Sequence, residues 1–338
     1  MDFVNALVSM ASAHTSLELL RLSLSTGVAD RRAAIRWPLD SWRKLTELTL
    51  SDLVKFGCPS SYELGNTLAN CPGLHALRMN DIDPVWEQDR EHSTIHLPSL
   101  RLFVTSDQPK PGLLHLLTLM KFGDQSLDFR LFSRALSPRS EIESLMTRSN
   151  VEALTINSTK RVRIKVLKSY LLCVPRLRVL LISSQNSPAW GLGRLATLTD
   201  FDLPKHLPLL RWVCLMDGFI KPTYLARTQA FLANNAIRDL AFIGCDFFYP
   251  TNTSDTGIQA NDRDEDSDSD SDEENDLIDG IYPDCVTEVC RSSGPYPMAE
   301  STRVELLQTF ERVLVLDARP GCIHKGEDTF IRALVNAE

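Results

Sequence analysis

The stretch "HLPLLRWVCLMDG", residues 206–218, decides the fold because almost the same phrase, "HLPSLRLFVTSD", occupies residues 96–107. Both begin with His-Leu-Pro, continue through one residue to Leu-Arg, and enter an apolar run that ends near an Asp. Related phrases occur as "NCPGLHALRMND" at 70–81 and "CVPRLRVLLISS" at 173–184. So many echoes in one chain indicate an internal repeat.

The repeat has the template L-x-x-L-x-L when the echoes are aligned on the Leu that follows the Pro. Copies start at Leu17, Leu45, Leu74, Leu100, Val151, Leu177, Leu210 and Ile237, in steps of 28, 29, 26, 51, 26, 33 and 27 residues. We divide the 51-residue step with a degenerate copy, "DQSLDF" at Asp124, which keeps Leu127 and Phe129. A last copy, "ERVLVL" at 311–316, keeps Leu314 and Leu316.

This period and template are typical of leucine-rich repeats. Side chains two residues apart on a strand point to the same side, so the last two Leu of each copy enter a core that only stacked units can close. Segments 112–120, 137–150 and 165–175 have helical spacing and predict the return crossovers. At the joints we expect His-Leu-Pro to close a helix and Leu-Arg to start a strand. The sequence therefore predicts an α/β fold, a ribonuclease-inhibitor-like leucine-rich-repeat solenoid with irregular repeats of about 24–33 residues.

The formal net charge of −8 is concentrated in residues 261–279, which hold eleven acidic residues and one Arg. The rest of the chain is close to neutral, so no basic face for nucleic acid is expected. We expect a solenoid at 1–250, a disordered acidic insert at 251–280, and a C-terminal repeat or cap of the same solenoid at 281–338. Ser267, Ser269 and Ser271 each precede an acidic residue by three positions, which suits phosphorylation by an acidophilic kinase; a plain solvated spacer is the alternative.

Composition and motifs favour a reduced, non-membrane, non-catalytic protein. The eight cysteines are scattered without a Cys-x-x-Cys pair, and no apolar run approaches the roughly 20 residues that span a bilayer. We therefore expect a cytoplasmic or nuclear protein. His92 and His96 lack the Glu of a zinc-protease helix, and "GLGRL" at 191–195 lacks a third glycine. We expect no enzyme activity, no cofactor and no metal.

Binding is the expected function, because a solenoid offers a long surface lined by strands. Residues that flank the core Leu point away from the core, and along the chain they change from polar to apolar. The candidate partner-binding residues are Arg78, Asn80, Val179, Leu181, Trp212, Cys214 and Met216. The alternative is that the loop 186–205 or the C-terminal tail covers the apolar part as ordinary core.

The irregular steps and the joints "LPSLR" and "VPRLR" resemble the leucine-rich region of fungal F-box-type proteins. The resemblance covers roughly residues 15–250 and 300–320, and it implies a ubiquitin-ligase substrate receptor that presents a protein partner. An F-box itself is not recognisable before the first repeat at Leu17, so a Skp-type adaptor is expected only if an F-box lies upstream. The alternative is a freestanding leucine-rich-repeat scaffold or inhibitor unrelated to ubiquitin.

Overall fold

The structure is a computed structural model of the 338-residue chain. It describes residues 18–23, 42–51, 53, 58–87, 90, 93–106, 110–133, 139–158, 164–183, 202–216, 219–220, 222–235, 237–247, 298, 300–316, 331 and 333–335. The predicted acidic insert, its three serines and residues 186–201 of the predicted loop 186–205 lie outside the described residues.

Strands and helices alternate along the chain. The strands are β1 (Leu19–Ser23), β2 (Glu47–Ser51), β3 (Ala76–Asn80), β4 (Ile95–Leu97), β5 (Leu102–Ser106), β6 (Met120–Phe122), β7 (Leu127–Ser133), β8 (Val151–Ser158), β9 (Val179–Ser183), β10 (Trp212–Met216), β11 (Phe219–Ile220), β12 (Asp239–Ile243), β13 (Asp246–Phe247) and β14 (Arg312–Leu316). The helices are α2 (Ser61–Ala69), α3 (Pro111–Leu119), α4 (Ser140–Thr147), α5 (Ile164–Leu172), α7 (Leu203–His206), α8 (Pro222–Asn234) and α10 (Glu300–Leu307).

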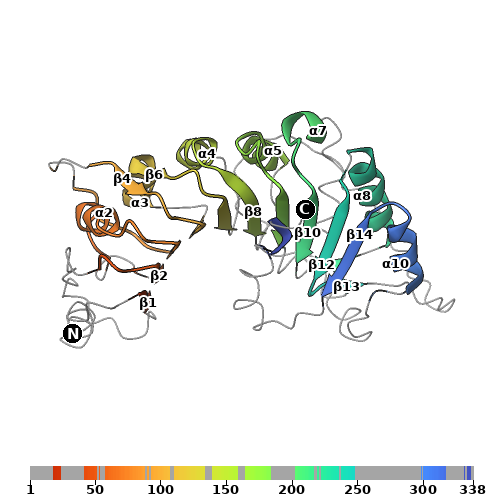
Figure 1. The fold of residues 1–338 in the computed structure, drawn as a ribbon, viewed down its shortest axis with the longest axis horizontal. Helices are drawn as coiled ribbons and strands as arrows, with labels where there is room; N and C mark the ends of the chain where they lie inside the picture. Colours follow the sequence, from red (N-terminus) through yellow and green to blue (C-terminus); the bar gives the residue numbers. More distant parts are fainter. Residues whose placement is uncertain are drawn as a thin grey trace, which may run out of the picture.

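One parallel sheet carries the fold. Its order is β1-β2-β3-β5-β7-β8-β9-β10-β12-β14, so strands that pair are also successive repeats. The sheet bends into an arch whose inner side is lined by strands, while the helices lie along the outer side (Figure 1). This architecture is a leucine-rich-repeat solenoid. β12 and β14 are neighbours with Asp239 opposite Arg312, so the sheet continues across a separation of 73 positions in the sequence.

The core is a ladder of large apolar side chains on the helix side of the sheet. In successive strands, Leu48, Leu77, Phe103, Phe129 and Leu154 lie opposite one another and are at most 1% exposed. Phe103 and Phe129 also pack ring to ring at 5.4 Å between centroids. The residues at the fourth position of the template thus form a continuous row in which each contacts its counterpart in the next unit. Contacts of this kind close the core of a stacked repeat protein.

Two degenerate copies of the template lie in a different register from the one predicted. In β14 the residues on the core ladder are Val313 and Val315, opposite Leu240 and Phe242, whereas Leu314 lies opposite Ala241 on the other face. The copy therefore starts at Phe310, which is buried, and not at Glu311.

The copy predicted at Asp124 is displaced by two residues. Phe129 lies opposite Phe103, and Leu131 opposite Thr105, so Phe129 and Leu131 are its ladder residues. Leu127 is buried as well, but a register shift between Leu127 and Asp128 separates it from the regular pairing. Leu127, Phe129 and Leu131 alternate as three apolar residues, so the sequence alone fits two alignments that differ by two residues.

The His-Leu-Pro phrase has two different structural roles. At 206 it closes α7, as predicted, because this helix ends at His206. At 96 the prediction was wrong: His96 and Leu97 belong to β4, which pairs in parallel with β6 outside the main sheet. A short apolar run does not by itself decide between a helix end and a strand.

Close backbone approaches fix how the repeats stack on the helix side. A Cβ on Gly112, at the start of α3, would lie 1.8 Å from the carbonyl oxygen of Pro84 in the preceding unit. The Arg148 guanidinium donates to the carbonyl oxygens of Leu117 and Met120, which closes the C-terminal end of α3. Among the described residues no helix is both long and apolar enough to cross a membrane.

Candidate binding face

The candidate site is the inner face of the main sheet, which we call the concave face. The parallel register aligns its side chains in three rows across the strands. The middle row contains Arg21, Thr49, Arg78, Val104, Arg130, Thr155, Leu181, Cys214, Ala241 and Leu314. Because each strand alternates its side chains, none of these residues belongs to the core ladder on the helix side.

The first half of the concave face combines partly open polar side chains with a small buried apolar cluster of Ala76, Leu102 and Val104, and we call it the polar half. Arg78 of β3 pairs with Glu47 of β2 at 3.7 Å, and their side chains are 20% and 40% exposed. Asn80 follows on the same strand and is half-buried. An exposed pair of this kind contributes little to stability, so its side chains are available to a ligand at small cost.

A buried ion pair on β7 separates the polar half from the apolar half. Arg130 donates to one carboxylate oxygen of Asp128 through Nε at 3.0 Å and through Nη2 at 2.6 Å. The two side chains are only 6% and 8% exposed. The sequence analysis did not single out this pair, although the alternation that places Leu127 and Phe129 in the core also places Asp128 and Arg130 on the concave face.

The second half of the concave face is apolar and buried. Its residues form one cluster, which we call the apolar groove: Ala153, Val179, Leu181, Trp212, Cys214, Met216, Ala241 and Ile243. Ile331, Leu334 and Val335 from the C-terminal part of the chain belong to the same cluster. The cover expected from the C-terminal tail is therefore present. Burial raises the pKa of the Cys214 thiol, so this cysteine is protonated and inert at neutral pH.

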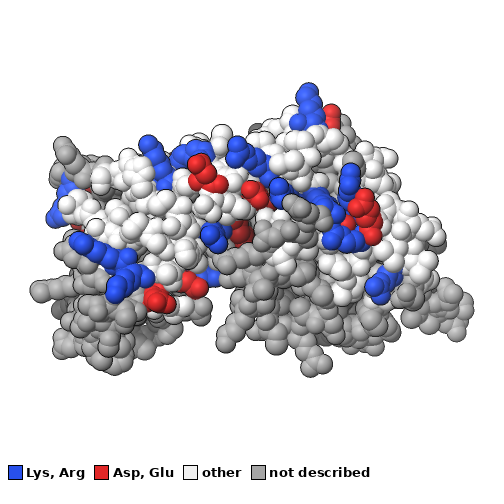
Figure 2. All heavy atoms as spheres, in the orientation of Figure 1, with Lys and Arg blue, Asp and Glu red and all other residues white. Residues whose placement is uncertain are grey.

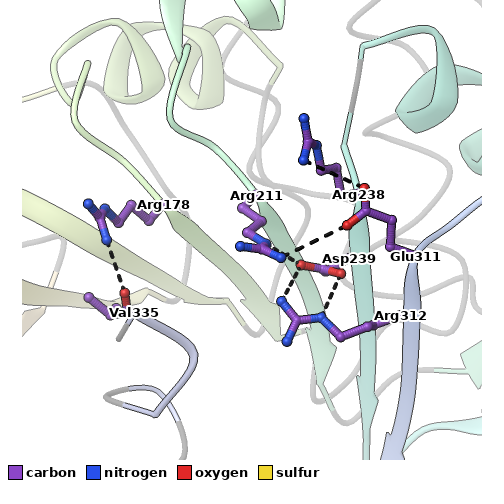
Figure 3. Close-up of polar contacts among 7 residues, drawn as sticks. All are labelled: Arg178, Arg211, Arg238, Asp239, Glu311, Arg312 and Val335. Carbon is purple, nitrogen blue, oxygen red and sulfur yellow. Dashed lines mark hydrogen bonds and ion pairs between the residues drawn. The ribbon is translucent and has the colours of Figure 1, made fainter. Parts of the chain in front are cut away.

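A second charge cluster closes the far end of the groove. Asp239 is fully buried and accepts hydrogen bonds from Arg211 Nε at 2.6 Å and from Arg312 Nε and Nη2 at 3.0 and 2.9 Å (Figure 3). The Arg312 guanidinium also lies over the Trp212 ring, 4.8 Å from its centroid. Farther out, Glu311 pairs with Arg211 and Arg238. The sequence alone gave no signal for this cluster, since Arg312 is distant in the chain.

The structure brings the predicted binding residues onto one face but in two settings. Arg78 and Asn80 lie in the polar half, whereas Val179, Leu181, Trp212, Cys214 and Met216 lie together in the covered apolar groove. His96 is exposed on β4, away from this sheet. Cys285, Cys290 and Cys322 lie outside the described residues. Within the described residues no cluster of three His, Cys, Asp or Glu side chains suits a metal ion.

Several polar atoms of the concave face have no hydrogen-bond partner. They are the side-chain atoms Asn80 Oδ1, Thr155 Oγ1, Ser183 Oγ and Trp212 Nε1, all buried. An unpartnered buried polar atom costs about 1–3 kcal/mol, so native proteins keep few of them. Their concentration on one face marks it as the part of the protein that its own fold leaves unsatisfied.

Comparisons with known proteins add a fold-level likeness. No family model matches the chain, and no curated protein does. Among solved structures, a TLR13–ssRNA13 complex is 13% identical with a TM-score of 0.34, and the match covers 62% of this chain and 31% of that one. An internalin (inlF) from Listeria monocytogenes is 16% identical with a TM-score of 0.27, covering 62% of this chain and 58% of that one.

The chain thus spans about a third and somewhat over half of these two structures. Because both TM-scores are below 0.5, the fold assignment rests on the sheet order and the register of the repeats.

The charged surface is of mixed sign. On the face that Figure 2 shows, Lys and Arg side chains form a band that Asp and Glu side chains interrupt.

Proposed function

We propose that the protein is a protein-interaction module that binds a partner along its concave face. The observation that carries the proposal is the set of four buried, unpartnered polar atoms on that face, from Asn80 on β3 to Trp212 on β10. A bound chain supplies backbone and side-chain groups at just such positions along parallel strands. No arrangement of nucleophile, base and oxyanion donors accompanies them among the described residues, which favours binding over catalysis.

The polar half provides the charges that orient a partner. Arg78 and Glu47 lie side by side and partly exposed, so a partner reaches both without disrupting the core. Charges at the edge of an interface act mainly on association rate and on partner choice. Reversing the sign of Arg78 therefore tests the face without a large loss of stability.

A photo-crosslinking amino acid at position 80 tests the proposal in cells. The matched control carries it at Lys121, an exposed residue of β6 outside the main sheet. We expect a partner that crosslinks from position 80 and not from position 121. With that partner purified, Arg78→Glu should weaken binding at least tenfold, while Lys121→Glu leaves it unchanged. A partner that crosslinks only from position 121, or binds Arg78→Glu as tightly as wild type, contradicts the proposal.

A finer version of the proposal makes the protein the substrate-recognition part of an F-box-type ubiquitin ligase. Its support is the resemblance of the joints "LPSLR" and "VPRLR" and of the irregular repeat steps. Tagging the protein at its own locus and probing for a Skp-type adaptor tests it. Recovery of the concave-face partner without adaptor or cullin favours the alternative, a freestanding scaffold or inhibitor.

A further inference from the structure

The apolar groove holds a segment that has the pattern of an amphipathic helix. Residues 331 and 333–335 have helical backbone, and Ile331, Leu334 and Val335 are spaced i, i+3 and i+4. These three side chains are 1%, 6% and 9% exposed, whereas Ala333 between them is exposed. Amphipathic helices that bind in hydrophobic grooves place their anchor side chains at this spacing.

The described residues of the segment are held by contacts with the groove. Besides its three aliphatic side chains, one polar contact fixes it: Arg178 Nη1 donates to the carbonyl oxygen of Val335 at 3.3 Å (Figure 3). The side chains of the groove therefore match a helix with this apolar spacing.

This occupant leaves the groove incompletely filled. A cavity of about 240 Å³ remains beside it, lined by Ile331 and Val335 on one side and by Arg101, Gln125, Ser126, Asp128 and Ala153 on the other. Two polar atoms of this half, Trp212 Nε1 and Thr155 Oγ1, also stay without hydrogen-bond partners while the segment is in place. An occupant that extends toward Asp128 would fill the cavity, and one that places polar groups next to Thr155 and Trp212 would also satisfy these two atoms.

We propose that the apolar groove receives an amphipathic helix of a protein partner, with branched aliphatic residues at i, i+3 and i+4. The chain's own residues 331–335 occupy the groove until such a helix displaces them. The inference rests on the proposed function, because it names the partner chemistry for one half of the same face. The cis segment is favoured without a partner because it is tethered to the same chain, and a partner helix displaces it because it also fills the cavity beside Ile331 and Val335.

The test compares two full-length variants, one with a charge on the buried side of the segment and one with a charge on its exposed side. Leu334→Asp buries a carboxylate against the groove and should release the segment. Ala333→Asp is the matched control, since it adds the same charge to the exposed side of the same turn. The probe is a fluorescein-labelled synthetic peptide of residues 327–338, followed by anisotropy. We expect the Leu334→Asp protein to bind it at least tenfold more tightly than wild type or Ala333→Asp, and a peptide carrying Leu334→Asp not to bind.

Alkylation of Cys214 reports the same event from inside the groove. Iodoacetamide should modify Cys214 at least tenfold faster in Leu334→Asp than in wild type, and the peptide should restore protection. The amides of β9, β10 and β12 should stay protected from hydrogen exchange in both proteins, which shows that the strands beneath the segment are folded. If Leu334→Asp also exposes these amides, the double variant Leu334→Ala, Val335→Ala removes the aliphatic contacts without burying a charge and is tested in the same way.

The inference is overturned if the amides of β9, β10 and β12 stay protected while the peptide does not bind either released variant. It is also overturned if wild-type protein forms dimers that Leu334→Asp abolishes, because the occupant is then a second copy of this chain. Either result leaves the proposed function standing as long as Arg78→Glu still weakens the concave-face partner. Loss of that effect with intact peptide binding would instead refute the proposed use of the polar half alone.

Discussion

Replacing Asp239 with Ala should loosen the C-terminal end of the solenoid while leaving the first repeats unchanged. The Asp239 carboxylate is fully buried and receives three hydrogen bonds from two arginines on the neighbouring strands. Arg211 precedes β10 and Arg312 begins β14, so one carboxylate connects three units of the sheet. The variant removes this connection and leaves two cations facing each other.

The size of the loss in stability depends on how well water can hydrate the two arginines once the carboxylate is gone. Breaking a fully buried ion pair by removing one partner costs about 3–5 kcal/mol. Here the freed side chains of Arg211 and Arg312 are 29% and 38% exposed, so solvent offsets part of the loss. We expect Asp239→Ala to lower the free energy of unfolding by about 2–3 kcal/mol. Asp239→Asn, which keeps the shape but not the charge, should lose roughly half as much.

Hydrogen exchange locates the effect and urea unfolding measures it. In a solenoid each repeat contacts only its neighbours, so the loss should be confined to nearby units. Amides of β14 should exchange at least tenfold faster in Asp239→Ala, and those of β2 and β3 should not change. Glu311→Ala is the control: its pairs with Arg211 and Arg238 are exposed and should contribute at most about 0.5 kcal/mol. Unchanged protection in β14, or equal loss in β2, refutes the reasoning.

Three further changes test the packing of the repeats. Gly112→Ala should lower the free energy of unfolding by about 3 kcal/mol, because its Cβ would meet the Pro84 carbonyl oxygen at 1.8 Å, whereas Gly73→Ala has open space and should stay near wild type in the same urea titration. Phe129→Ala should cost about 3–5 kcal/mol, measured by urea unfolding, since its ring is fully buried between neighbouring strands; a loss under 1 kcal/mol contradicts its place in the ladder. Burial raises the pKa of the Cys71 thiol from 9.0 to about 12. As the pH rises, the thiol of the unfolded chain ionises before the buried one does. The free energy of unfolding is therefore unaffected by this thiol below about pH 9 and falls by about 1.4 kcal/mol per pH unit up to about pH 12. Relative to Cys71→Ser, wild type should therefore lose about 2 kcal/mol between pH 9 and 10.5, and parallel stability curves would contradict the shift.

The sequence predicts the stack well where each copy has two distinct faces. In "LTELTL" the alternation of Leu with polar residues assigns the core side without ambiguity, and β2 has the expected pattern of buried and half-buried positions. The helices at 111–119 and 164–172 follow from their apolar spacing in the same way. Period and alternation together are enough for the fold because side-chain direction on a strand is strictly periodic.

The prediction fails in β14, which is apolar on both sides and whose copy has no Leu at the first template position. In "FERVLVL" Val and Leu alternate, so a shift of one residue exchanges Val313 for Leu314 without changing the hydrophobic pattern. Only the pairing with β12 assigns Val313 to the core and Leu314 to the concave face. A one-residue slip reverses every side chain of a strand, which is why sequence reasoning could not place the last repeat.

The same argument explains why the candidate site was only half predictable. Val179, Leu181 and Trp212 stand out in the sequence as apolar residues on the face away from the core, but nothing local shows what covers them. The cover comes from Ile331, more than a hundred residues away in the sequence, and the ion pairs that bound the groove come from β7 and from β12 with β14. Contacts between distant segments depend on how many repeats separate them, which a local pattern does not encode.

The two ion pairs define the length of helix that the apolar groove can accept. Asp128 on β7 and Asp239 on β12 lie four strands apart in the sheet order, which is about 19 Å at a spacing of about 4.8 Å per strand. A helix that crosses the strands covers this distance with about 13 residues at 1.5 Å each. The cavity beside Ile331 and Val335 lies toward Asp128, at one end of this distance. A partner helix of about three and a half turns should therefore bind more tightly than a helix of two turns, and further lengthening past the charged ends should add little, because those ends are already paired within the protein.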